Sequence, residues 1–138
     1  MIVDTSAWIE YLRRTESPYD LCLEDAVRTG GAIATPALAV AELLAGCRSE
    51  SEALDLLRLL NRFEILTPDS LDQCQSAALI YRACRLGGRT IRSIVDCMVA
   101  AAALHAQRPL LARDRDFRTI ARYTELELVV PAAPASQP

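Results

Sequence analysis

The chain has 138 residues, which is enough for one compact domain and too few for two ordinary ones. Its formal net charge of −3 argues against a protein that wraps nucleic acid through bulk charge, although its basic residues are all arginines and are concentrated in the second half. A single histidine, His105, and five widely spaced cysteines without a Cys-x-x-Cys pair argue against the usual zinc sites and against a histidine-based acid–base mechanism.

Short apolar runs alternate with longer helical patterns along the chain. In chain order, the first half predicts a strand at 1–3, helices at 5–14 and 21–29, a strand at 32–34, helices at 36–44 and 50–61, and a strand at 63–66. Thr35 is a suitable N-cap, and Pro36 a suitable first residue, for the third of these helices. The second half predicts helices at 70–86 and 93–107, a strand at 109–112, a helix at 117–121, a strand at 127–130 and a disordered tail at 131–138.

This alternation predicts an α/β fold. Strands separated by helices imply right-handed crossovers and a central parallel sheet of four or five strands, covered by helices on both faces in a three-layer sandwich. We expect one such domain over residues 1–130. Ligands of these sheets collect beyond the carboxyl ends of the strands, so functional residues are expected there.

Three carboxylates lie in segments that otherwise favour burial. Asp4 directly follows the first strand, Glu42 is the only charged residue of its helix, and Asp96 is the only one from 93 to 104. Burying an unpaired carboxylate costs several kcal/mol, so each acid must be neutral, paired with a cation or bound to a metal. For any single acid, an arginine from elsewhere in the chain explains the pattern as well as a functional site does.

Two further acids, Asp114 and Asp116, follow another predicted strand, and independent ion pairs for all of them become the weaker explanation. Carboxylates about 4 Å apart repel by roughly 4 kcal/mol at an effective dielectric constant of 20, so a cluster needs a cation. Oxygen ligands without His or Cys favour Mg²⁺ or Mn²⁺, and such an ion activates water for phosphodiester hydrolysis. The candidate catalytic residues and metal ligands are Asp4, Glu42, Asp96, Asp114 and Asp116.

Four segments carry these acids in a fixed order. They read Val-Asp-Thr-Ser at 3–6, Ala-Glu-Leu-Leu-x-Gly at 41–46, Val-Asp-x-x-x-Ala-Ala at 95–101 and Leu-Leu-x-x-Asp-x-Asp-Phe at 110–117. Their order and spacing resemble the PIN-domain nucleases, in particular the VapC toxins of bacterial VapBC toxin–antitoxin systems. The resemblance extends from residue 2 to about residue 130.

The resemblance implies a Rossmann-like PIN-domain sheet and an Mg²⁺-dependent endoribonuclease, with Mn²⁺ as a substitute ion. It also implies an RNA substrate, a VapB-type antitoxin that blocks the site, a toxin homodimer and a toxin–antitoxin hetero-oligomer. By position, the acidic quartet of the family corresponds to Asp4, Glu42, Asp96 and Asp114. Asp116 matches an additional acid and Ser6 the site hydroxyl, whereas Ala112 replaces a threonine that many relatives carry.

Arginines near the last two acids are candidates for holding the RNA backbone. They recur at three- and four-residue spacings, which on helices would place several on a shared face, where guanidinium groups suit phosphate oxygens. A solvated surface whose arginines pair with acids explains the spacing equally well. The candidate RNA-binding residues are Arg89, Arg92, Arg113 and Arg115.

Other functions fit the sequence less well. A receiver domain needs a lysine, which is absent, and a haloacid-dehalogenase-type phosphatase needs an aspartate where Ser6 stands. A catalytically weak or inactive PIN domain that binds RNA or protein is the main alternative, and a DNA or flap nuclease of the wider superfamily is the other. No apolar stretch reaches the roughly 20 residues that span a bilayer and no signal peptide is visible, so we expect a cytoplasmic location without membrane contact.

Overall fold

Four short parallel strands form the central sheet of the chain. The computed structural model describes residues 1–68 and 70–132. The strands are β1 (Ile2–Val3), β2 (Ala34–Pro36), β3 (Glu64–Leu66) and β4 (Leu110–Leu111), in the order β3-β2-β1-β4. The strand predicted at 127–130 is reduced to one parallel bridge between Leu110 and Leu128, flanked by two backbone hydrogen bonds of Leu110.

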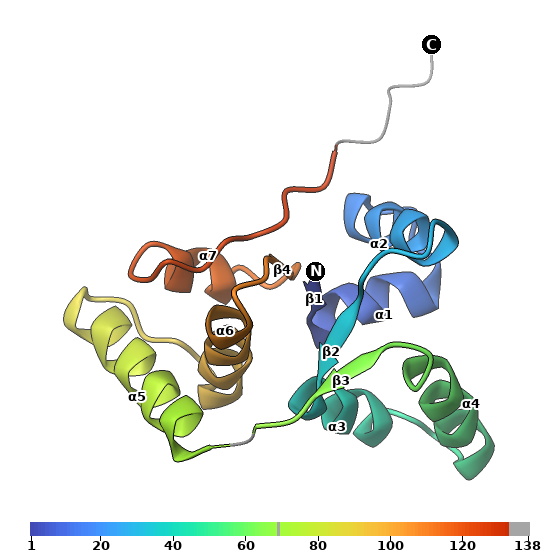
Figure 1. Cartoon of the computed structure of the whole chain (residues 1–138), viewed down its shortest axis with the longest axis horizontal. Coiled ribbons are helices and arrows are strands. Elements are labelled where there is room, and N and C mark those ends of the chain that lie inside the picture. The colour runs from blue at the N-terminus through green and yellow to red at the C-terminus, as the bar shows by residue number, and fades with distance from the viewer. Residues whose placement is uncertain (69, 133–138) are drawn as a thin grey trace.

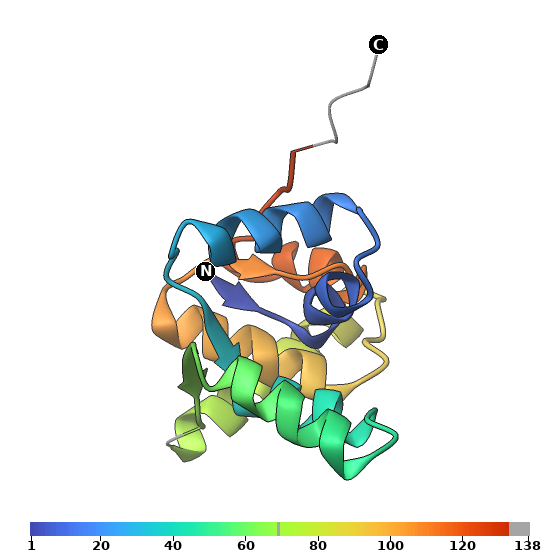
Figure 2. The ribbon, with the colours of Figure 1, turned by 90° about the vertical axis from the view of Figure 1, so that its right-hand side faces the viewer.

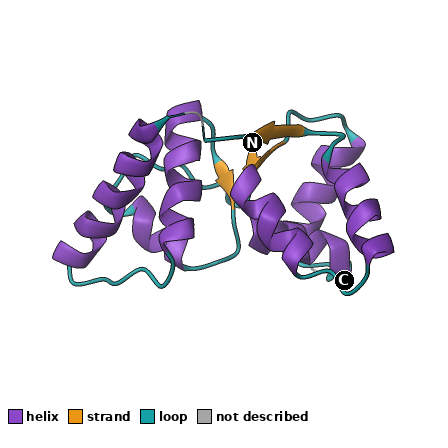
Figure 3. Ribbon diagram, turned by 90° about the horizontal axis from the view of Figure 1, so that it is seen from below, coloured by secondary structure: helices purple, strands orange, loops and turns teal. Residues whose placement is uncertain are grey.

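Helices cover both faces of this sheet, which confirms the three-layer α/β prediction. One face carries α1 (Thr5–Arg13), α2 (Pro18–Arg28), α3 (Ala37–Ala45) and α4 (Glu50–Leu60), and the other carries α5 (Leu71–Leu86), α6 (Ile94–Ala106) and α7 (Asp116–Ala121). Figure 1 and Figure 3 show the strands between the two groups of helices. Figure 2 looks onto the face covered by α1, α2 and α4.

Alternate residues of the strands belong to different cores. Ile2 and Leu110 pack with the apolar residues of α5, α6 and α7, whereas their neighbours Val3 and Leu111 pack with those of α1 to α4. All four side chains are fully buried. Because successive side chains of a strand point to opposite faces, two-residue strands suffice to join both helical layers, and their uniformly apolar sequence follows from burial on both sides.

The start of α3 differs from the prediction. Thr35 and Pro36 belong to β2, and the helix begins at Ala37, so the prediction that Thr35 caps the helix is wrong. The Thr35 hydroxyl instead accepts a hydrogen bond of 3.0 Å from the indole N–H of Trp8. Both residues are fully buried, and a buried indole N–H needs an acceptor, so this tertiary contact overrides the local capping preference.

The second helix begins earlier than predicted, at Pro18. Ser17 caps α2 by accepting a hydrogen bond from the backbone N–H of Asp20, and Pro18 occupies the first helical position. Of the predicted disordered tail, residues 133–138 lie outside the described residues. Among the described residues, no helix combines the length and the apolar composition needed to cross a bilayer.

Candidate active site

The sheet order brings the first and last groups of acids together. Because β1 and β4 are adjacent and parallel, their carboxyl ends meet at the same edge of the sheet. Asp4 directly follows β1, and Asp114 and Asp116 follow β4. Asp4 and Asp116 are buried, whereas Asp114 is partly exposed. The edge predicted to hold functional residues therefore carries three of the five candidate acids.

Ser6 links these two chain segments. Asp4 is the N-cap of α1, and its Oδ2 atom accepts hydrogen bonds from the backbone N–H of Ser6 at 2.9 Å and from the Ser6 hydroxyl at 2.6 Å. The Ser6 oxygen in turn accepts from the backbone N–H groups of Arg113 at 2.9 Å and Asp114 at 3.3 Å. One hydroxyl thus holds the Asp4 carboxylate and the loop after β4 in a common arrangement.

Asp96 and Glu42 reach the same region from two helices. Asp96 lies in the first turn of α6, which Ser93 caps, and Glu42 lies on α3 and is exposed. Burial raises the pKa of Asp96 to about 7, and four neighbouring negative charges contribute to the rise. Those charges belong to Asp4, Asp114, Asp116 and Glu42. Each of the other four candidate acids is therefore close enough to Asp96 to influence its ionisation.

The pKa values of two other acids are also raised. For Asp4 the main cause is burial, which outweighs the hydrogen bonds from Ser6, and the charge of Asp114 adds to it. For Glu42 the causes are burial and then the charge of Asp4. Burial is therefore the main cause of both shifts, and the negative charge at the carboxyl edge of the sheet adds to it.

Arg92 supplies positive charge to the cluster. One terminal nitrogen of its guanidinium lies 2.8 and 2.9 Å from the two carboxylate oxygens of Asp114. Its Nε and its backbone N–H donate to Oδ2 of Asp116, at 3.1 and 3.2 Å. Asp116 also donates its own backbone N–H to Asp114 at 3.0 Å. Arg92, a candidate RNA-binding residue, therefore lies among the acids and makes ion pairs with two of them.

One further buried acid, Glu10 on α1, is not among the residues predicted from the sequence. Its carboxylate accepts a hydrogen bond of 2.6 Å from the Thr15 hydroxyl and forms an ion pair with Arg113. The hydrogen bond from Thr15 is the largest cause of its lowered pKa. Glu10 follows the buried Ala7 at helical spacing, and this is the one pattern that could have identified it. The ion pair ties the loop after β4 to α1.

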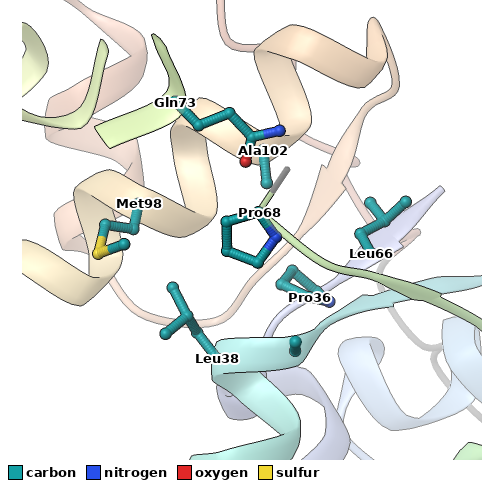
Figure 4. Close-up of a pocket in the computed structure, with 8 residues that line it drawn as sticks. Pro36, Leu38, Leu66, Pro68, Gln73, Met98 and Ala102 are labelled. Carbon is teal, nitrogen blue, oxygen red and sulfur yellow. The ribbon is translucent and has the colours of Figure 1, made fainter. Parts of the chain in front are cut away.

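The remaining candidate arginines, Arg89 and Arg115, line an open hollow next to Asp116. A second hollow, beside the ends of β2 and β3, is apolar (Figure 4), and no residue that lines it carries a charge. His105 lies at the end of α6, where its ring forms a 3.0 Å hydrogen bond with Ser76 of α5. Among the described residues, neither the apolar hollow nor His105 therefore offers a second set of converging charged groups.

The donor set of the cluster fits a hard divalent cation. It consists of carboxylates and one hydroxyl, and Mg²⁺ and Mn²⁺ prefer such oxygen ligands. No group of three or more His, Cys, Asp or Glu side chains among residues 1–68 and 70–132 is closely enough spaced to hold a metal ion as it stands. Carboxylates that converge on one site repel one another, and a bound cation removes that repulsion.

Comparisons with known proteins identify the family of the chain. The PIN domain family matches residues 1–123 of the chain. VapC ribonuclease Mb1587 of Mycobacterium bovis and ribonuclease VapC11 of Mycobacterium tuberculosis are each 39% identical over 132 residues, which covers 92% of this chain and 96% of the relative.

The fold is also similar to those of solved structures. The complex VapBC-1 from nontypeable Haemophilus influenzae matches with a TM-score of 0.74 at 18% identity, over 93% of this chain and 95% of that one. VapBC2 from Rickettsia felis, bound to a DNA fragment from its promoter, matches with a TM-score of 0.73 at 20% identity, over 93% of this chain and 96% of that one. At these identities the likeness shows the fold.

Proposed function

Because the chain belongs to the PIN-domain family, and within it to the VapC ribonucleases, we propose that it is an endoribonuclease toxin that hydrolyses RNA phosphodiester bonds. The observation that carries this proposal is the convergence of five carboxylates near the carboxyl edge of the sheet, where burial and the charges of the other four raise the pKa of Asp96. PIN-domain nucleases generally use a divalent metal, and the all-oxygen donor set favours Mg²⁺ here, with Mn²⁺ as a substitute.

The roles of the acids follow from their positions. When bound, the metal supplies an activated water for in-line attack on an RNA phosphate and offsets the negative charge of that phosphate. The residues that would hold it are Asp4, Asp96 and Asp114, while Glu42 and Asp116 would act through water or at a second ion. Among the supporting residues, Ser6 holds the Asp4 carboxylate and Arg92 keeps Asp114 and Asp116 together.

The proposed partners are a VapB-type antitoxin and a second copy of the chain. Solved structures with the same fold are toxin–antitoxin complexes, among them one from Klebsiella pneumoniae. The chain also exposes several leucines on its outer helices, including Leu12 of α1, Leu21 of α2 and Leu54 of α4. Such residues are suited to contact with another protein. We also propose a cytoplasmic location, because an RNA substrate and an antitoxin of this kind are found there.

Cleavage of single-stranded RNA by the purified protein tests the proposed function. We expect cleavage with Mg²⁺, its loss on addition of EDTA, and its return when Mg²⁺ is restored in excess. Asp4→Asn and Asp96→Asn should each reduce cleavage by about 100-fold or more, because each removes a charged oxygen ligand. Circular dichroism should show that both variants remain folded.

Asp55→Asn is the matched control for these variants. Asp55 is an exposed acid of α4 that pairs with Arg58, so this variant should cleave as the wild type does. Undiminished cleavage by both Asp4→Asn and Asp96→Asn would contradict the proposed site. Binding of RNA by the wild type without cleavage, in both Mg²⁺ and Mn²⁺, would instead favour an inactive PIN domain that acts as a binding module.

A further inference from the structure

Four arginines gather next to the acid cluster from segments far apart in the sequence. Arg89 precedes α6, whereas Arg115, Arg118 and Arg122 lie on α7 or at its ends. Together with Thr90, Thr119 and Asp116 they line an open hollow of about 480 Å³. Because Asp116 belongs to both the cluster and the hollow, the two features are continuous.

These arginines differ from the other two near the site in having no carboxylate partner. Arg92 pairs with Asp114 and Asp116, and Arg113 pairs with Glu10. Among the described residues, none of the four that line the hollow forms a salt bridge, and all four are exposed. Arg118 donates one hydrogen bond, of 3.2 Å, to the Tyr19 hydroxyl. A solvated surface of paired charges therefore does not describe this hollow.

Like charges at helical spacing oppose the folded arrangement. Arg115, Arg118 and Arg122 follow one another at three- and four-residue intervals along α7, where neighbouring like charges repel one another. Arg89 adds a fourth positive charge from the facing segment. An anion in the hollow would turn this repulsion into attraction.

The hollow has two walls, the segment between α5 and α6 that carries Arg89, and α7 with its ends. Hydrogen bonds join these walls near both ends of that segment. At one end, the Tyr123 hydroxyl donates to the Gly87 carbonyl at 3.1 Å. A Cβ atom at Gly87 would lie 2.3 Å from the Tyr123 ring, so the absence of a side chain permits this close approach. At the other end, Arg92 binds Asp116. The distance between Arg89 and α7 is therefore set before any ligand arrives, which reduces the cost of binding.

We propose that this hollow binds the phosphate groups of the RNA strand that flank the bond to be cleaved. The inference rests on the proposed ribonuclease function and adds the path of the substrate, which leaves the acid cluster past Asp116 and over α7. Guanidinium groups bind phosphate oxygens through paired N–H donors. Contacts to phosphate position a strand without reading its bases, so the hollow raises affinity and leaves the cleavage sequence unchanged.

The double variant Arg89→Gln/Arg122→Gln tests this inference by removing one charge from each wall. We expect KM for a single-stranded RNA oligonucleotide to rise about ten-fold, with kcat changed less than about two-fold and the cleavage positions unchanged. The dependence of log(kcat/KM) on log[salt] should become shallower by about 1.4, because each lost phosphate contact to a single strand contributes about 0.7.

The matched control is Arg28→Gln/Arg58→Gln, which removes the same charge from exposed positions on α2 and α4. Its KM and salt dependence should equal those of the wild type. Anisotropy measurements of RNA binding in EDTA separate the two proposals. If the wild type does not cleave RNA but binds it through Arg89 and Arg122, the ribonuclease proposal fails and the hollow is retained. If the Arg89→Gln/Arg122→Gln variant matches the wild type in both KM and RNA affinity, the hollow does not bind RNA.

Discussion

Arg92 shows how one side chain can determine the charge balance of a site. Five carboxylates near one another need a compensating cation, and the guanidinium of Arg92 contacts the two that follow β4. It does not contact Asp96, whose pKa is raised to about 7 by its burial and by the surrounding acids. Arg92 therefore offsets only part of the negative charge of the cluster. A metal ion would reduce the remaining repulsion most if it bound near Asp96.

Removal of Arg92 should make the stability of the protein more dependent on metal. In the metal-free protein, we expect Arg92→Gln to lower the free energy of unfolding only slightly, since Arg92 is exposed and water screens its ion pairs. Repulsion among the acids then increases, so saturating Mg²⁺ should raise the melting temperature of the variant more than that of the wild type. Thermal unfolding followed by circular dichroism, with EDTA and with Mg²⁺, measures both effects.

Arg28→Gln provides the comparison, because it also breaks an exposed ion pair, the one with Asp25, away from the acids. Its response to Mg²⁺ should equal that of the wild type. A response of Arg92→Gln no larger than that of Arg28→Gln would show that Arg92 does not offset the charge of the cluster.

At this scale the sequence locates the candidate acids better than their partners. Glu42 and Asp96 are recognisable because each is isolated in an apolar helix, and the structure places both near Asp4. The ion pair between Glu10 and Arg113 joins residues 103 positions apart, and nothing local in either segment indicates it. Such pairings depend on the strand order, which brings α1 and the loop after β4 together.

At the scale of elements, local signals locate most helices and fail where a tertiary contact competes. The predicted helices 50–61 and 70–86 agree with α4 and α5 to within one residue at either end. The start of α3 was mispredicted because the Thr35 hydroxyl accepts the hydrogen bond of the buried Trp8 indole. The strand at 127–130 was overpredicted, since its apolar pattern yields only a bridge beside β4.

Thr35→Val should destabilise the fold, because it removes the hydrogen bond between the Trp8 indole and the Thr35 hydroxyl. Valine matches threonine in shape but leaves the Trp8 indole N–H without an acceptor, which should cost about 1–3 kcal/mol. Thr35→Ser keeps the hydroxyl and loses only a methyl group, so it should cost less than Thr35→Val. Urea denaturation gives both values. Equal stability of Thr35→Val and the wild type would show that the indole bond contributes nothing to the junction of α1 and β2.

At the scale of the whole molecule, two helical layers share a minimal sheet, and the acids collect at its carboxyl edge. Alternate strand residues face the two cores, so the strands are buried on both sides. The apolar strands and the helices between them can be predicted from the sequence. A parallel sheet then puts Asp4 and Asp114, which each follow a strand, at the same edge, as the structure has them. The pairing of Arg92 with the acids and the hollow beside α7 required the assembled chain.

The acid cluster should make the stability of the whole fold depend on pH. The pKa of Asp96 rises from 3.8 to about 7 on folding, so the folded chain binds this proton more tightly than the unfolded chain does. Protonation therefore favours the folded state, and this contribution is lost as the pH rises through about 7. With metal removed by EDTA, we expect the free energy of unfolding to increase as the pH falls from about 8 to about 5.

Asp96→Asn isolates this contribution, because asparagine has a similar shape and does not ionise. In EDTA at pH 8 the variant should be more stable than the wild type, and its stability should change less with pH. Asp4 and Glu42, whose pKa values are also raised, account for the slope that remains. Saturating Mg²⁺ should reverse the wild-type trend, because metal ligands must be deprotonated. Urea denaturation at each pH measures these slopes, and an unchanged slope in Asp96→Asn would show that Asp96 ionises without strain in the folded protein.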